Sequence, residues 1–151
     1  MKVIISIILS LLVYTYSFAS TSQLQKSCDS FGGQMTSKIQ CLTSGKSRDG
    51  QFCILKRASN NKPEVFFNGC TKSLGGYGEV FHEACIEHDL CYHQPFGASE
   101  LTKQDCDSLF YQDMLEICKG DTTGIKGCNA MAYTFYSAVF YFGKKSWKCT
   151  N

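Results

Sequence analysis

Apolar residues recur at helical spacing in two neighbouring segments in the second half of the chain. The first segment, from about Glu79 to His93, ends before the breaker sequence Gln94-Pro95-Phe96-Gly97. The second runs from about Ser99 or Thr102 to Cys118, and its apolar positions are Leu109, Phe110, Met114, Leu115 and Ile117. Because the connection is short, the pattern predicts two adjacent antiparallel helices.

An aromatic run from Ala130 to Phe142 predicts a third helix near the C-terminus. We assign its larger side chains to the core side of that helix rather than to a ligand-binding site: Tyr133, Tyr136, Val139, Phe140 and Phe142. Four basic and aromatic residues close the chain as a patch suited to anionic lipid headgroups, although we expect a solvated tail: Lys144, Lys145, Trp147 and Lys148.

The segment before these helices, residues 20–64, is polar and rich in turn signals. Its short apolar run from Gln51 to Arg57 predicts a strand, paired in a hairpin with residues from Ser37 to Thr43. We therefore expect a mainly α-helical protein with a small irregular or β-hairpin N-terminal part. The predicted division is a disulfide-pinned appendage over residues 20–64 and a main domain over residues 65–151.

Residues 1–19 have the pattern of a secretory signal peptide. One early charge, Lys2, precedes a long apolar run, and Ser17 and Ala19 occupy the positions expected before a cleavage site. A membrane anchor is the alternative, but the apolar run is shorter than the roughly 20 residues that a spanning helix needs. The sequence therefore predicts a secreted, extracellular protein.

All ten cysteines follow this segment. An even number in a small exported chain predicts a disulfide framework. Zinc binding by thiolates is the alternative, because Cys85 and Cys91 each lie three residues from His88, but export to an oxidising compartment argues against it. The formal net charge is only +2, so nothing points to nucleic acid.

One face of the first helix carries groups that can do chemistry. Cys85, His88, Asp89 and Tyr92 stand at i, i+3, i+4 and i+7 and project from one side of a helix. An imidazole can take a proton from water while a neighbouring carboxylate supplies oxygen to a hard cation. The pattern therefore predicts a site that holds water and a metal ion together.

A glycine-rich segment, Val65 to Gly78, directly precedes this helix. Glycines let a loop turn its carbonyl oxygens inward, and calcium accepts such oxygens together with amide and carboxylate groups. Most loops of this kind are only connectors. The position next to the His-Asp helix makes a calcium loop the more specific interpretation.

Asp107 follows Cys106 near the start of the second helix. If Cys91 bonds Cys106, Asp107 comes close to His88, where it can hold one ring nitrogen and leave the other for chemistry. A lone aspartate on a helix is more often a solvated charge. Only the adjacent cysteine favours the functional interpretation.

The order of loop, His-Asp helix, turn and Cys-Asp helix resembles the secreted, calcium-dependent phospholipase A2 superfamily. The chain reads ACIEHDLCY from Ala84 to Tyr92 and is similar in particular to the short bacterial, fungal and conodipine branches, which follow this motif with a CDxxFxxDM helix. The resemblance covers about Phe66 to Cys118. Ala84 replaces the first cysteine of the pair found in many members, and its usual partner would fall near Asp113, so one whole bridge is missing.

The resemblance implies a phospholipase A2 that hydrolyses the sn-2 ester of glycerophospholipids. In this interpretation His88 is the general base on a water and Asp107 orients it. Tyr92 hydrogen-bonds Asp107, and the backbone amide of Thr71 assists the oxyanion.

The resemblance also implies a calcium ion held by the Asn68 side chain, the Gly69 carbonyl and a bidentate Asp89. Asn68 is uncharged where the bacterial enzymes have a carboxylate, and we expect this difference to weaken calcium binding. Three disulfides are expected: Cys70–Cys85, Cys91–Cys106 and Cys118–Cys128. The sequence does not assign the partners of the other four cysteines: Cys28, Cys41, Cys53 and Cys149.

The expected partner is a phospholipid membrane surface, bound peripherally and reversibly; headgroup preference and oligomeric state are not predicted. Four apolar residues flank the site and line either an acyl channel or the core: Phe66, Phe67, Val80 and Phe81. Two other functions stay open, namely a non-catalytic phospholipase A2-like binding protein or toxin subunit, and a cystine-rich domain with no ligand. The set of His88, Asp89 and Asp107 argues against both.

Overall fold

The computed structural model describes residues 23–41, 44–55, 65–70, 77–93, 101–120 and 127–150. The predicted signal peptide, residues 1–19, and the breaker sequence, residues 94–97, lie outside these ranges. Helical residues 23–30 precede the labelled elements, which are β1 (Gln34–Gln40), β2 (Ser47–Leu55), β3 (Val65–Phe67), α2 (Tyr77–Val80), α3 (His82–Tyr92), α4 (Lys103–Gly120), α5 (Cys128–Phe142) and α6 (Lys144–Thr150). Within the described ranges no helix is both long and apolar enough to cross a membrane.

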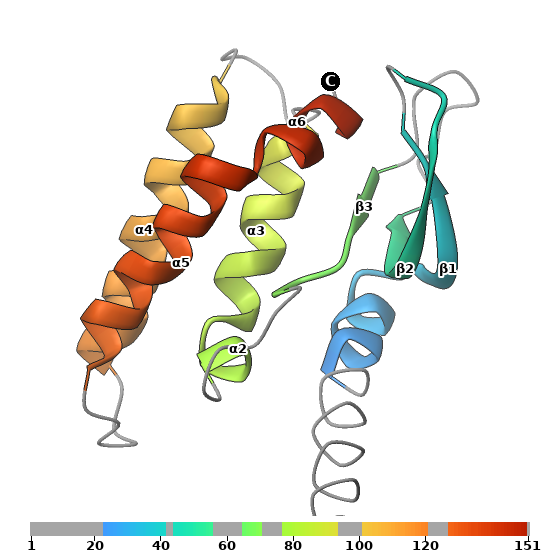
Figure 1. The fold of residues 1–151 in the computed structure, drawn as a ribbon. Coiled ribbons are helices and arrows are strands. Elements are labelled where there is room, and N and C mark those ends of the chain that lie inside the picture. The colour runs from blue at the N-terminus through green and yellow to red at the C-terminus, as the bar shows by residue number, and fades with distance from the viewer. Residues whose placement is uncertain are drawn as a thin grey trace, which may run out of the picture.

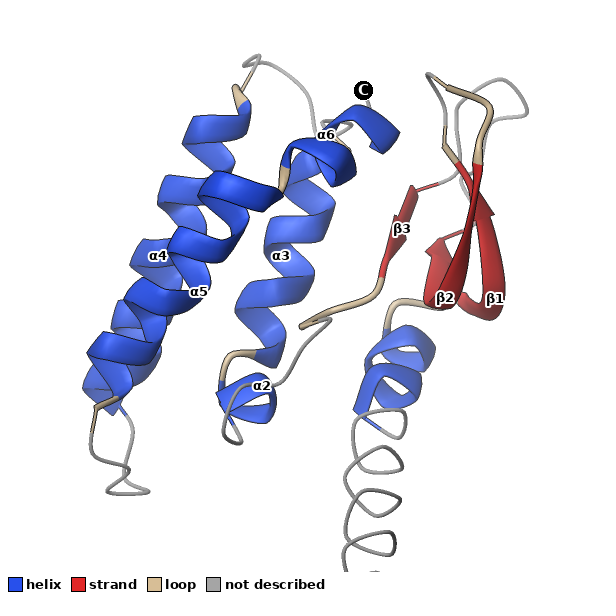
Figure 2. Ribbon diagram, viewed as in Figure 1, coloured by secondary structure: helices blue, strands red, loops and turns tan. Residues whose placement is uncertain are grey.

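The fold is mainly α-helical with a small antiparallel sheet, which confirms the predicted fold class (Figure 2). Figure 1 shows α3 between the α4–α5 pair and the strands, with α3 and α4 running antiparallel. The helix expected from about Glu79 to His93 is interrupted by a turn at Phe81, which separates α2 from α3. The second and third helices form within a few residues of their predicted bounds.

The central helix α3 is buried on two sides. Ile86 packs on the sheet side in a cluster with Leu24 and Phe67, whereas Ala84 packs on the helix side in a cluster with Phe110. Since α3 buries both faces, its register is fixed from both directions and the side chains between them are held in place.

The sheet has the order β1-β2-β3, and all neighbours are antiparallel. Alternate residues of β2 face opposite sides: Cys53, opposite Phe67, packs toward α3, whereas Ile54, opposite Phe66, packs toward the C-terminal segment. The division predicted at residue 64 falls between β2 and β3, which are hydrogen-bonded neighbours in this one sheet.

Five disulfides join all ten cysteines. Three of them are the pairs expected from the sequence, Cys70–Cys85, Cys91–Cys106 and Cys118–Cys128. The other two are Cys28–Cys53, within the N-terminal part, and Cys41–Cys149, which ties the hairpin to the last helix across 108 residues. Because this bridge closes the longest loop, it restricts the unfolded chain most, and in the chain-entropy model it stabilises the fold by about 4 to 5 kcal/mol.

The structure corrects part of two expectations about the C-terminal region. The core side of α5 is formed by Ala132 and Phe135, whereas Tyr133, Phe140 and Phe142 are 59%, 43% and 80% exposed. Tyr136 and Val139 are only partly buried against the core.

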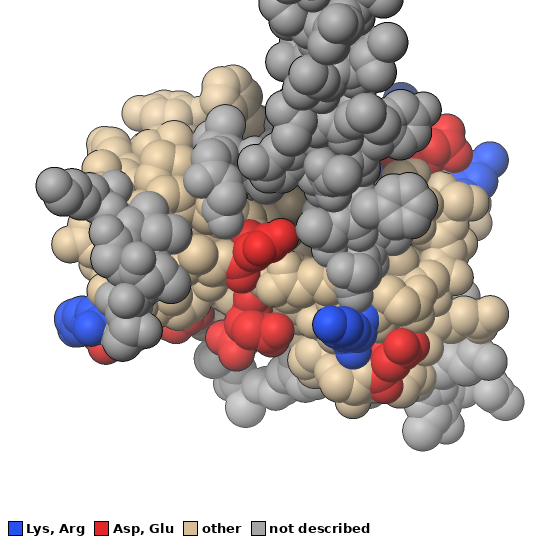
Figure 3. Space-filling model, turned by 90° about the horizontal axis from the view of Figure 1, so that it is seen from below, with Lys and Arg blue, Asp and Glu red and all other residues tan. Residues whose placement is uncertain are grey.

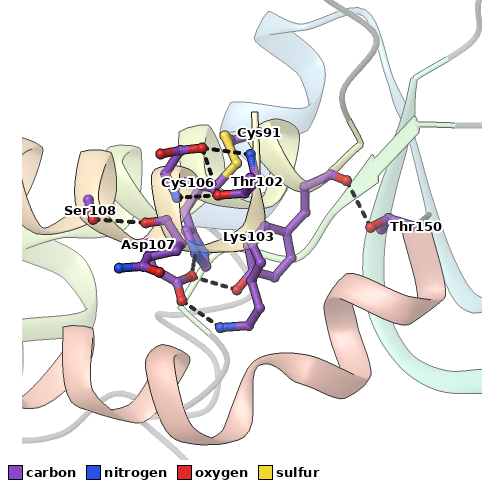
Figure 4. Close-up of a disulfide and its surroundings, with 11 residues drawn as sticks. Cys91, Thr102, Lys103, Cys106, Asp107, Ser108 and Thr150 are labelled. Atoms are coloured by element: carbon purple, nitrogen blue, oxygen red, sulfur yellow. Dashed lines mark hydrogen bonds and ion pairs between the residues drawn. A yellow bond between two sulfur atoms is a disulfide. The ribbon is translucent and has the colours of Figure 1, made fainter. Parts of the chain in front are cut away.

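The expected solvated tail forms the helix α6, in which Lys144, Lys145 and Lys148 are exposed as expected. Its residues Cys149 and Thr150 are buried, the first through its disulfide and the second through a hydrogen bond to the backbone carbonyl of Tyr92 (Figure 4). Sequence periodicity did not reveal this helix because a bridge to a distant hairpin, not an apolar stripe, holds it in place.

Candidate active site

A buried histidine-aspartate pair links the two central helices. His88 on α3 and Asp107 on α4 are 6% and 0% exposed, and His88 Nε2 lies 2.9 Å from Asp107 Oδ1. The Cys91–Cys106 disulfide joins the same two helices within one turn of both residues (Figure 4). The covalent bridge therefore fixes the helix register that makes the pair.

The carboxylate of Asp107 has two further donors. Tyr92 Oη donates to Oδ1 at 2.7 Å, and Lys103 Nζ forms an ion pair with Oδ2 at 2.5 Å. Burial alone would raise the pKa of Asp107, but hydrogen bonds from His88, Lys103 and Tyr92, with the charge of Lys103, hold it below its usual value. Asp107 therefore stays ionised and every one of its oxygens is bonded.

Lys103 is a site residue that the sequence interpretation missed. Its amine also donates to the backbone carbonyls of Val139 at 2.9 Å and Phe140 at 3.4 Å near the end of α5. The signal was present, because Lys103 and Asp107 are four residues apart and so adjoin on a helix. A cap fixes where α4 begins and so which side chains face inward. In this cap Asp105 accepts hydrogen bonds from the backbone amide and the hydroxyl of Thr102.

Asp89, one residue after His88, has a different environment. Its Oδ2 accepts hydrogen bonds from the backbone amides of Asn68 at 2.9 Å and Gly69 at 3.0 Å. Removal from water nevertheless raises the pKa of Asp89 to about 6, against the opposing effects of these amides and of the charges of His88 and Arg48. Among the described residues no basic side chain forms an ion pair with Asp89.

The turn at Gly69 depends on glycine. Its φ is +65°, and a Cβ there would lie 3.1 Å from the ring of His82. His82 is itself buried and hydrogen-bonded through Nε2 to Ser27 Oγ at 3.0 Å, so the N-terminal helix supports the loop from behind. This support was not predicted, since it joins residues 55 positions apart.

The oxygen donors around Asp89 fit a hard cation. In the part of the chain that the structure describes, no group of three or more His, Cys, Asp or Glu side chains gathers around a metal position. A cation at Asp89 would therefore draw on the amide oxygen of Asn68 and the carbonyl oxygen of Gly69, two ligand types that calcium accepts. Thr71 lies outside the described residues.

His88 and Asp89 line a cavity of about 590 Å³ together with Asn68 and Gly69. Its walls are largely aromatic, and they are formed by Phe52, Phe66, Phe110, Phe135 and Phe142. This size and character suit a small apolar ligand with one polar end. Of the four apolar residues expected near the site only Phe66 lines the cavity, whereas Phe67 and Phe81 are core residues and Val80 packs against the core.

A histidine-aspartate pair on two disulfide-linked antiparallel helices, beside a second aspartate and an apolar cavity, defines a member of the phospholipase A2 superfamily, in its short conodipine-like branch. Residues 46–143 match the family model of prokaryotic phospholipase A2, and the chain belongs to this family. The chain is similar to conodipine-P3 of Conus purpurascens, with 42% identity over 55 residues that cover 34% of this chain and 29% of that protein. The match thus spans less than a third of the relative's length. No solved structure matches the chain significantly.

Proposed function

We propose that the chain is a secreted, calcium-dependent phospholipase A2 that cleaves the sn-2 ester of a glycerophospholipid. The observation that carries the proposal is the orientation of His88: its Nε2 is bonded to Asp107, and the ring lines the apolar cavity. A neutral imidazole that donates from Nε2 keeps a lone pair on Nδ1, which makes Nδ1 the basic atom.

The chemistry assigned to His88 is general base catalysis. Nδ1 takes a proton from a water molecule as the water oxygen bonds the ester carbonyl carbon. When the tetrahedral intermediate collapses, the bond between the carbonyl carbon and the glycerol oxygen breaks, and the proton on Nδ1 passes to that oxygen. Asp107 stabilises the positive charge on the ring throughout, since its carboxylate stays ionised.

The calcium ligands of the proposal are the Asp89 carboxylate, the Asn68 side chain and the Gly69 carbonyl. Bound calcium would supply positive charge for the developing oxyanion and for the substrate phosphate. The raised pKa of Asp89 and the absence of an ion-pair partner for it among the described residues support this assignment. The amide of Thr71 remains part of the proposal.

The proposed partner is an anionic membrane surface, bound through exposed residues at the junction of α5 and α6. We call this surface the α5–α6 patch: Phe140, Tyr141, Phe142, Lys144, Lys145 and Lys148. Phe142 also lines the cavity, so a lipid at the patch adjoins the site. The end of the molecule shown in Figure 3, near α2, has acidic side chains at its centre, with basic side chains beside them.

The deciding experiment measures release of fatty acid from mixed phospholipid vesicles with calcium and with a chelator. We expect release only with calcium, and His88→Gln should lower it at least a hundredfold, the usual scale of general base catalysis, while the variant stays folded. Co-sedimentation of His88→Gln with vesicles reports membrane binding apart from turnover. Binding without any release by the unmodified protein would instead favour the non-catalytic binding protein, and full activity of His88→Gln would exclude His88 as the base.

A further inference from the structure

Arg48 is a cation in the wall of the cavity that the proposed mechanism does not use. It lies on β2, is half-buried, and lines the same cavity as His88, Asn68 and Asp89. Its charge acts on Asp89, so the two groups share one electrostatic environment. Arg48 belongs to the hairpin, outside the segment from Phe66 to Cys118 that carries the catalytic motifs.

The guanidinium of Arg48 is poorly satisfied by the protein. Within the described residues its one hydrogen bond is from Nη1 to Ser146 Oγ, at 3.4 Å, and no carboxylate forms an ion pair with it. A guanidinium has five N–H donors in a planar fork that matches the oxygens of a phosphate. An arginine kept in a cavity wall with so few partners has donors left for an anionic ligand.

Strand pairing and a disulfide hold Arg48 in its position. Ile39 on β1 lies directly opposite it, and the Cys41–Cys149 disulfide ties the same hairpin to α6. Ser146, on α6 and three residues before Cys149, also lines the cavity. The bridge therefore holds β2, which carries Arg48, next to α6, which carries Ser146, in the wall of the cavity that Asp89 also lines.

We propose that Arg48 binds the phosphodiester oxygens of the phospholipid and so positions the ester over His88. This inference rests on the proposed function and names the group that recognises its substrate. The apolar walls take the acyl chains, Arg48 takes the phosphate, and the ester lies between them, next to the base. A fork of two N–H donors on one phosphate also distinguishes arginine from lysine at this position.

The test separates binding from turnover with a short-chain diether phospholipid, which has the phosphate and the chains but no ester. Its affinity is measured by calorimetry in calcium buffer for the unmodified protein, Arg48→Gln, Arg48→Lys and Lys38→Gln. Lys38 is an exposed residue of β1, so Lys38→Gln removes the same charge from the same hairpin outside the cavity. Melting temperatures of all variants verify folding, and Arg48→Lys retains the charge if Arg48→Gln folds poorly.

We expect Arg48→Gln to weaken diether binding about ten- to a hundredfold, the usual value of hydrogen bonds to a charged group. Arg48→Lys should recover part of that loss and Lys38→Gln should bind normally. With a monomeric short-chain diester substrate the loss should appear mainly in KM, because the base is intact. Inorganic phosphate, tested alone, should bind far more weakly than the diether lipid.

Three results would overturn the assignment. Equal affinities of Arg48→Gln and the unmodified protein for the diether lipid would show that Arg48 does not bind the substrate. An equal loss of affinity in Lys38→Gln and Arg48→Gln would show that only the net charge of the protein matters. Inorganic phosphate that binds as tightly as the lipid would make the wall a free-phosphate site. Failure of the proposed function looks different, because the unmodified protein would then release no fatty acid in calcium.

Discussion

The α3–α4 interface and the junction of β3 with α3 each hold one aspartate of the site, and the two carboxylates are treated in opposite ways. Asp107, at the helix interface, is fully buried and accepts bonds from His88, Tyr92 and Lys103. Asp89, at the strand junction, accepts two backbone amides and faces the cavity. The pKa of Asp107 is lowered, whereas that of Asp89 is raised to about 6.

The two carboxylates therefore differ in how fully the protein supplies them with hydrogen-bond donors and ion-pair partners. A buried charge is tolerable when donors surround it and costly when they do not. The helix interface provides its own ion-pair partner, Lys103, whereas no described residue forms an ion pair with Asp89, although the charge of Arg48 acts on it from farther away. Asp107 therefore stabilises the folded chain, whereas the carboxylate of Asp89 is open to the cation that the proposed function assigns to it.

Among substitutions that test this difference, Asp107→Asn should have the largest effect on stability. The amide keeps the shape of the carboxylate but loses the charge that Lys103 and His88 face, so we expect unfolding to become easier by about 2 to 4 kcal/mol. Hydrolysis should fall about a hundredfold. Denaturant unfolding and vesicle hydrolysis measure the two effects.

The pH dependence of this loss follows from the lowered pKa of Asp107. A carboxylate with a lowered pKa in the folded state contributes stability above its unfolded pKa and loses it as pH falls through the folded value. The difference between Asp107→Asn and the unmodified protein should therefore be full at neutral pH and shrink only in strong acid. A variant as stable as the unmodified protein at pH 7 would show that the network does not hold the helices together.

Asp89→Asn should have a smaller effect, of the opposite sign, when calcium is absent. Because the pKa of Asp89 is raised, the ionised form destabilises the folded chain, and stability is lost as pH rises from the unfolded value through about 6. In chelator at pH 8 we expect Asp89→Asn to be about 1 kcal/mol more stable than the unmodified protein, discounted because Asp89 is partly exposed. At pH 4 the two should converge.

Calcium should reverse this order, since it stabilises only a chain that binds it. Melting temperatures of Asp89→Asn and the unmodified protein at pH 8, with calcium and with chelator, measure the order of stability under both conditions. If Asp89→Asn is destabilised in chelator as much as Asp107→Asn, the two aspartates play the same structural role and the contrast between them is wrong.

The parts of this site that the sequence could predict are those carried by short spacings. The face with His88, Asp89 and Tyr92 follows from helix geometry, and Asp107 from its place beside Cys106. Long-range pairing carries the rest: β2 brings Arg48 to the cavity, and the bridge from Cys41 to Cys149 brings α6. Periodicity contains no information about which distant cysteines meet.

The aromatic residues of α5 show a different limit. Their number suggested a core face, but helix position decides burial, and Phe135 is buried while Phe142 is 80% exposed. Exposed aromatics beside lysines are also what a lipid surface selects, so composition alone could not separate core from membrane contact.

A similarly small effect on stability, with the sign of the Asp107→Asn effect, is expected from Lys103→Met, which removes the cation of the helix interface and leaves its other donors. Lys103 is 20% exposed and bonds Asp107 together with two carbonyl oxygens at the end of α5. We expect a loss of about 1 kcal/mol, since part of this ion pair is screened by water. Hydrolysis should fall less than tenfold, because His88 and Tyr92 still hold the carboxylate.

The chain offers a matched control for this last prediction in Lys119→Met. Lys119 forms an ion pair with Glu116 on the same helix, but both side chains are about 70% exposed, and such a pair contributes little to stability. If Lys103→Met and Lys119→Met melt alike in denaturant, the cation does not close the network around Asp107. Calcium protection of both variants should equal that of the unmodified protein, because Lys103 belongs to the aspartate that is already satisfied and not to the one that faces the cavity.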